Sequence, residues 1–150
     1  MLQTNILFLD ETNNDRSILA EAYYNHGLKN VARASSAGFE PAEQLDRHLY
    51  DLLKADGVCP DDYCPKPVDI FLQAYSPRID LIVAFKPLRG AFKLPIFPNH
   101  PAVLHLSVED SRGRVSEGGI KRAVRSCYAD LKLSIDRAVA SGKLPGAIAA

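Results

Sequence analysis

The stretch that decides the fold is "NILFLDETNNDRSILAEA", residues Asn5 to Ala22. It opens with a continuous apolar run, continues as a polar loop, and ends with apolar residues at helical spacing. This order predicts a strand, a tight loop and a helix. Such loops often hold anions, because the first backbone N–H groups of the helix have no partner there. This loop nevertheless carries three carboxylates, on Asp10, Glu11 and Asp15.

The rest of the chain repeats the alternation of strand and helix. Buried strands are expected at four apolar runs, residues 6–9, 31–34, 81–85 and 102–106. Continuous rather than alternating apolar residues indicate a parallel sheet covered on both faces. Helices are expected over residues 16–26, 43–54, 66–75 and 120–138, with one helical turn near 89–93. We therefore expect a single α/β domain over residues 1–150, with ligands at the carboxyl ends of the strands.

The composition of the chain argues against nucleic acid and membranes as partners. The 18 basic and 18 acidic residues balance, so there is no electrostatic case for binding nucleic acid or an anionic membrane. No apolar run is long enough to span a bilayer. The start "MLQTNILFLD" lacks the basic segment and cleavage site of a signal peptide. We expect a cytoplasmic protein with reduced cysteines.

The opening stretch resembles that of the low-molecular-weight protein tyrosine phosphatases and the related thioredoxin-coupled arsenate reductases. In that family an apolar strand leads into the motif C-x5-R-[ST] and then a helix. Arg16 and Ser17 match the end of this motif, Asn13 matches a frequent loop asparagine, and Asp10 stands where the cysteine should be. Later landmarks resemble the family's second-strand ending, its loop before the third helix, and its late acid-bearing loop: "ASSAGFEP", "GVCPDDYCPKPV" and "VLHLSVEDS".

The resemblance implies a three-layer α/β/α fold with a four-stranded parallel sheet in flavodoxin-like order. In the family the cysteine thiolate attacks phosphorus, the arginine grips the phosphoryl oxygens, and a later aspartic acid protonates the leaving oxygen. The last two roles would fall to Arg16 and Asp110, whereas Asp10 replaces the nucleophile and cannot do thiol chemistry. The implied oxyanion loop consists of Glu11, Thr12, Asn13, Asn14, Asp15, Arg16 and Ser17.

Loss of a covalent nucleophile costs other hydrolases on the order of 10⁴-fold or more in turnover. We therefore expect a degenerate member of the family, inactive by the cysteine mechanism, that acts as a binding or regulatory protein. The expected partner is a protein or a small anion, and we expect no metal and no cofactor. Because three acids surround the site, phosphate and arsenate should bind weakly or not at all.

Two alternatives remain open at this point. Asp10, Asp15 and Asp110 could collect one magnesium ion for metal-assisted phosphoryl transfer, since hard cations prefer oxygen ligands. The sequence "LDETN" lacks the second aspartate of the D-x-D motif, which weakens this alternative. The other is a scaffold that assembles as a homo-oligomer through a helical face.

The loop acids have two expected uses. Asp15 precedes the helix and is a preferred N-cap residue. A carboxylate of Asp10 or Asp15 could also fill the anion position and pair with Arg16. Thr12 replaces the family's loop glycine and is less tolerant of positive φ, so the loop could be reshaped.

Other residues give weaker signals. Cys59 and Cys64 form C-x4-C, but the further ligands of a zinc site are missing. The region after the third expected strand also lacks the cysteine pair of the arsenate reductases. Cys127 is expected in the core, on the buried stripe of the last helix. Structural roles are expected for the four histidines, and packing or surface positions for two aromatic residues: His26, His48, His100, His105, Phe39 and Tyr63.

Overall fold

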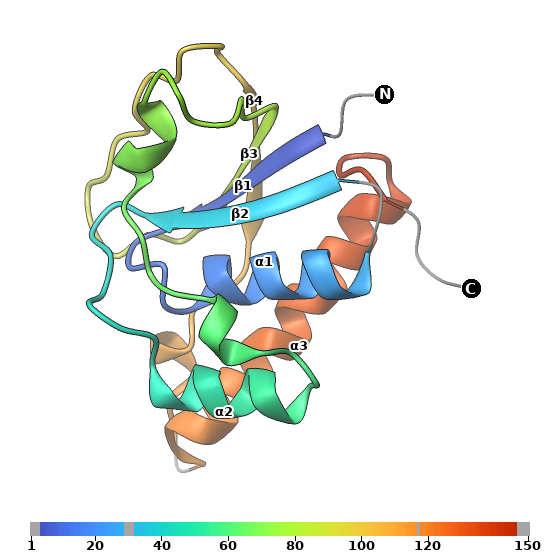
Figure 1. The fold of residues 1–150 in the computed structure, drawn as a ribbon. Helices are drawn as coiled ribbons and strands as arrows, with labels where there is room; N and C mark the ends of the chain where they lie inside the picture. The colour runs from blue at the N-terminus through green and yellow to red at the C-terminus, as the bar shows by residue number, and fades with distance from the viewer. Residues whose placement is uncertain (1–3, 29–31, 117, 147–150) are drawn as a thin grey trace.

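The computed structural model describes residues 4–28, 32–116 and 118–146 (Figure 1). Within them, four strands form one parallel sheet in the order β2-β1-β3-β4. This order is flavodoxin-like and confirms the predicted fold class. Val31, which opens the second predicted run, lies outside the described residues. The strands are β1 (Thr4–Asp10), β2 (Ala32–Gly38), β3 (Leu81–Lys86) and β4 (Ala102–Ser107).

The central strand β1 lies between β2 and β3, and its residues 6–9 are at most 1% exposed. Ile6 and Phe8 join the hydrophobic cluster on one face of the sheet, and Leu7 and Leu9 join the cluster on the other. Successive strand residues point to opposite faces, so a strand covered on both needs an unbroken apolar run. This is why the opening stretch predicts the sheet correctly.

The α-helices α1 (Arg16–Gly27), α2 (Arg47–Ala55) and α3 (Gly119–Ala140) gather on one face of the sheet (Figure 1). Helix α1 packs on β1, β2 and α3, and α2 packs on α3. Helix α2 begins later than expected, because the Asp46 carboxylate caps it by accepting from the backbone N–H of His48. Cys127 is fully buried in α3, as predicted.

The opposite face has a different cover from the one predicted. The helix expected over residues 66–75 is reduced to a 3₁₀ helix, η2 (Val68–Leu72), and the expected turn at 89–93 is not helical. An extended segment that includes Phe97 completes this layer. The chain is extended at Pro67, directly before η2, and again at Gln73, directly after it, so the helix is confined to five residues.

The loops that follow β1, β3 and β4 meet at the carboxyl edge of the sheet. The β1–α1 loop is shaped there by the chain after β2, whose backbone N–H groups bind the loop carbonyls of residues 10, 11 and 12. Gly38 permits this approach, because a Cβ there would lie 2.7 Å from the Asn13 nitrogen. In the described part of the chain, no helix is both long and apolar enough to cross a membrane.

Candidate functional site

Asp10 ends β1 and is only 2% exposed. Its carboxylate accepts hydrogen bonds from the backbone N–H of Asn13 at 2.8 Å, and from the N–H and hydroxyl of Ser17 at 3.0 and 2.7 Å. Ser17 is the second residue of α1, so the carboxylate lies at the positive end of that helix. Burial nevertheless raises the pKa of Asp10, because desolvation outweighs these bonds and the charge of Arg16.

Asn13 holds the loop in shape. Its φ is +51°, in the left-handed region that asparagine tolerates better than most residues. Its side-chain amide donates to the hydroxyls of Ser17 and Ser36 at 2.8 and 2.9 Å, and its oxygen accepts from the backbone N–H of Lys66 at 3.0 Å. Because Asn13 supplies the positive φ, Thr12 does not need it. The missing glycine therefore leaves the loop in place.

Arg16 is 1% exposed and reaches under the loops that follow β3 and β4. Its Nη1 donates to the carbonyls of Pro87 and Val108, each at 2.9 Å. Its Nη2 lies 3.6 Å from a carboxylate oxygen of Glu11. Among the described residues its Nε has no hydrogen-bond partner. Within the described part of the chain, the guanidinium is thus held by hydrogen bonds from Nη1 alone, and its Nε–Nη2 edge makes none.

The predicted partner of Arg16 was wrong. We expected Asp10 or Asp15 to pair with it, and the structure places Glu11 there. The reason is competition, because Asp10 bonds to the start of α1 and Asp15 bonds to the loop after β4.

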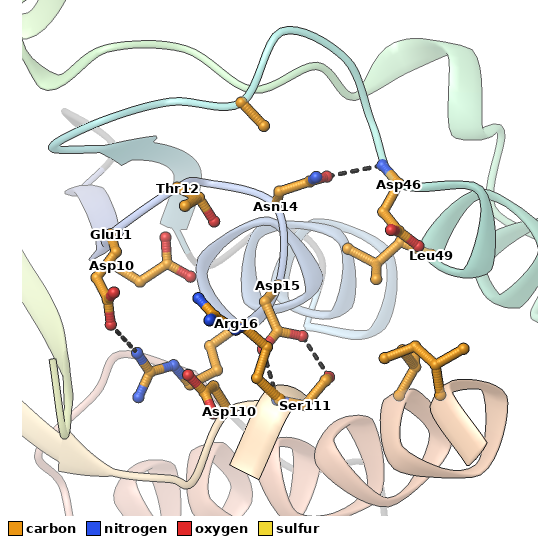
Figure 2. Close-up of a pocket in the computed structure, with 14 residues that line it drawn as sticks. Asp10, Glu11, Thr12, Asn14, Asp15, Arg16, Asp46, Leu49, Asp110 and Ser111 are labelled. Carbon is orange, nitrogen blue, oxygen red and sulfur yellow. Dashed lines mark hydrogen bonds and ion pairs between the residues drawn. The ribbon is translucent and has the colours of Figure 1, made fainter. Parts of the chain in front are cut away.

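Asp15 occupies the N-cap position of α1, but its side chain does not cap the helix, contrary to the prediction. Its two oxygens accept hydrogen bonds from the backbone N–H and the hydroxyl of Ser111, which Figure 2 marks as dashed lines. The two bonds are 2.7 and 2.5 Å long. Burial, with a contribution from the neighbouring charge of Asp10, raises the pKa of Asp15 to about 6. Asp15 therefore ties the two loops together.

Asp110 lies next to Ser111 in the loop after β4, and with Asp15 it lines a pocket at this edge of the sheet. It forms a two-pronged ion pair with Arg89, at 2.6 and 2.8 Å, and this pair lowers its pKa. The Arg89 backbone N–H also donates to Glu11 at 2.7 Å. An acid that stays ionised does not carry the proton a general acid must give. The general-acid role of Asp110 stays a prediction, and this ion pair opposes it.

Arg89 is a site residue that sequence reasoning missed. It joins Glu11 of the first loop to Asp110 of the last. Its only sequence signal is its place shortly after the third apolar run, at the carboxyl edge of the sheet.

The loops and helices enclose a pocket of about 210 Å³ (Figure 2). One wall is apolar and comes from Ala42, Leu49 of α2, and Ile120 and Val124 of α3. Ile120 is 37% exposed, so this wall is partly open to solvent. The rest of the lining is mainly acidic, with five carboxylates and two guanidinium groups, those of Asp10, Glu11, Asp15, Asp46, Asp110, Arg16 and Arg112.

Metal ligation finds no support in the arrangement of these acids. Within the described residues, no three or more His, Cys, Asp or Glu side chains are grouped to hold an ion. The carboxylates of Asp10 and Asp15 accept bonds from protein donors, and Asp110 is paired with Arg89. The magnesium alternative stays a prediction, and the ion pair of Asp110 with Arg89 counts against it. Cys59 and Cys64 are exposed thiols and do not line this pocket.

Comparison with known proteins adds the following. The sequence model of the family described as "Low molecular weight phosphotyrosine protein phosphatase" matches residues 5–89. An arsenate reductase from Archaeoglobus fulgidus is 28% identical, with 87% of this chain and 98% of that chain covered and a TM-score of 0.63. No protein in the curated set matches.

Two further solved structures share the fold at lower identity. A thioredoxin-dependent arsenate reductase from Corynebacterium glutamicum is 22% identical over 93% of this chain, with a TM-score of 0.63. This chain spans only 63% of the length of that enzyme. A tyrosine phosphatase from Erwinia amylovora is 15% identical over 93% of each chain, with a TM-score of 0.65.

Proposed function

Because the chain belongs to the low-molecular-weight phosphotyrosine protein phosphatase family and carries Asp10 in place of the nucleophile, we propose that it binds a ligand without hydrolysing phosphate esters. In this proposal the protein is a pseudoenzyme that works as a binding or regulatory module. Its ligand is a protein or a small molecule, bound at the pocket above the β1–α1 loop.

One observation carries the proposal, the occupation of the helix N-terminus by Asp10. Its carboxylate takes the N–H of Asn13 and both donors of Ser17. Thiolate chemistry needs a sulfur anion at the start of the helix, where N–H groups and the helix dipole stabilise it. Here those same stabilising groups hold a carboxylate whose lone pairs are engaged by three donors. The scaffold of the family remains, and its reactive atom is absent.

The charges around Arg16 also favour a ligand other than phosphate. Like charges about 4 Å apart cost roughly 4 kcal/mol at an effective dielectric of about 20. A phosphate dianion in the loop would meet the negative charge of Asp10 and, nearby, those of Glu11 and Asp15. Arg16 already uses Nη1 on two carbonyls. Weak phosphate binding is therefore part of the proposal.

The test is hydrolysis of p-nitrophenyl phosphate with a chelator present. We expect wild-type turnover on the order of 10⁴-fold or more below the roughly 1 per second of an ordinary enzyme. Asp10→Cys should gain activity, because the loop geometry held by Asn13 survives, and Asp10→Ser is the matched control without a thiol. Wild-type turnover near 1 per second that is abolished by Arg16→Ala would refute the proposal.

We also propose that the protein works in the cytoplasm. Cys59 and Cys64 are exposed free thiols, which suit a reducing compartment. Labelling of these thiols in intact cells before and after lysis would test the assignment. Cysteines oxidised in the native environment would contradict it.

A further inference from the structure

The Nε–Nη2 edge of Arg16 makes no hydrogen bond to any of the described residues. Arg16 is 1% exposed, and its Nε has no hydrogen-bond partner among the described residues. The nearest carboxylate oxygen to Nη2, on Glu11, is 3.6 Å away, beyond hydrogen-bond length. Leaving a buried donor unpaired is costly, so such groups normally have a partner. This edge of a guanidinium matches the two oxygens of a carboxylate.

The same pocket holds a carboxylate, that of Asp15, which forms no ion pair with another described residue. Among the described residues, the side chain of Asp15 accepts two hydrogen bonds, both from neutral donors of Ser111. Each carboxylate oxygen can accept more than one bond, so Asp15 still has capacity for an incoming cation.

The third element of the pocket is its apolar wall. Leu49 and Val124 are each 2% exposed, so the core around them holds them in place, whereas Ile120 is 37% exposed. The volume of about 210 Å³ lies below the roughly 300–1,000 Å³ of pockets for drug-sized ligands. The volume therefore suits a small occupant, and the apolar wall suits an apolar group on it.

We propose that this pocket binds a free α-amino acid with an apolar side chain. The carboxylate of the ligand lies on the Nε–Nη2 edge of Arg16, and its ammonium group lies on Asp15. Its side chain packs against Leu49, Ile120 and Val124. The inference rests on the proposed function, because it names the ligand of a site used for binding.

A zwitterionic ligand would account for the acidic residues in the β1–α1 loop, which in the family binds an oxyanion. A phosphate dianion places two negative charges near the carboxylates of Asp10 and Asp15. An α-amino acid has no net charge, and its ammonium group can pair with Asp15. Glu11 acts as the internal competitor, since it lies nearest to the free edge of Arg16 and is held by the Arg89 backbone N–H at 2.7 Å. Binding moves the Glu11 carboxylate away from that edge.

The direct test is calorimetric titration of the wild-type protein with L-leucine and matched analogues. N-acetyl-L-leucine lacks the ammonium group, isoamylamine lacks the carboxylate, and inorganic phosphate has neither feature. We expect leucine to bind and both organic analogues to bind about ten- to a hundred-fold more weakly, the range for hydrogen bonds to charged groups. No binding of leucine at millimolar concentration, or equal binding of N-acetyl-L-leucine, would overturn the inference.

Variants provide the second arm. Asp15→Asn should weaken leucine binding about ten-fold, while Asp69→Asn on η2, outside the pocket, should leave it unchanged. Glu11→Gln should strengthen binding, because it removes the competing charge. If Asp15→Asn fails to fold, the analogue series on the wild-type protein still decides. Leucine binding that is insensitive to Asp15→Asn would count against the inference.

This outcome is separable from the proposed function. A protein that hydrolyses p-nitrophenyl phosphate refutes the binding-only proposal whatever leucine does. A protein that neither hydrolyses p-nitrophenyl phosphate nor binds leucine refutes only the amino-acid inference.

Discussion

Replacing Asp15 by asparagine should change how stability depends on pH. The carboxylate is buried beside Ser111, and its pKa is raised from 3.8 to about 6. One pKa unit corresponds to 1.36 kcal/mol, so this rise corresponds to roughly 3 kcal/mol between the two protonation states. The folded protein therefore binds a proton at Asp15 more tightly than the unfolded chain does.

The sign follows from proton linkage. The folded pKa lies above the unfolded value, so the folded state carries more protons between about pH 4 and pH 6. The extra stability is fully present below the unfolded pKa and is lost as the pH rises through the folded pKa. Wild-type stability should thus fall by up to about 3 kcal/mol across this window through Asp15 alone. Asparagine cannot titrate, so its variant lacks that part of the slope.

The assay is urea unfolding at a series of pH values from about 4 to 7.5, which covers the sloping window between about pH 4 and pH 6 and the flat region above it. Asp69→Asn is the matched control, since Asp69 lies on η2 and its substitution removes a carboxylate outside the pocket. Asp15→Asn should be at least as stable as the wild type at pH 7 and lose that advantage toward pH 5. Parallel pH profiles for the wild type and Asp15→Asn would refute the reasoning, because Asp15 would then have an ordinary pKa in the folded protein.

Three further predictions concern the loops around the pocket. Arg89→Gln should raise the pKa of Asp110 toward its ordinary value, because the ion pair that lowers it is gone; a carbon-detected NMR titration of the carboxyl group measures this, and an unchanged pKa would speak against it. Gly38→Ala should destabilise the protein by about 1–3 kcal/mol in urea unfolding, since its Cβ would lie 2.7 Å from loop backbone, whereas Gly27→Ala meets only a ring at 3.4 Å and serves as the control. Inorganic phosphate should bind the wild type weakly in calorimetry and bind Asp10→Asn more tightly, and micromolar binding to the wild type would contradict the electrostatic argument.

The strands and the start of the site helix could be predicted from the sequence. Residues 6–9 and 81–85 are unbroken apolar runs, and a strand buried on both faces requires such runs. Strand β1 ends at Asp10, and α1 begins at Arg16 after a five-residue loop, as expected. These features depend on local chain geometry and on burial, which periodicity reports directly. The expected helix over residues 66–75 is shortened to η2, because the chain turns extended at Gln73, and the apolar spacing of Val68, Phe71 and Leu72 does not report where the helix ends.

The partners of the charged side chains were decided only by the tertiary structure. The sequence alone determined that three acids share a loop with Arg16, but it carried no information on where each carboxylate points. Asp15 bonds to Ser111, 96 residues away, and Glu11 meets Arg89, 78 residues away. Such pairs form because parallel strands bring their following loops to one edge of the sheet, whatever their separation along the chain. Each carboxylate then takes the nearest donors in that edge, so Asp10 stabilises the helix, Asp15 joins two loops, and the Nε–Nη2 edge of Arg16 is left without a hydrogen-bond acceptor among the described residues.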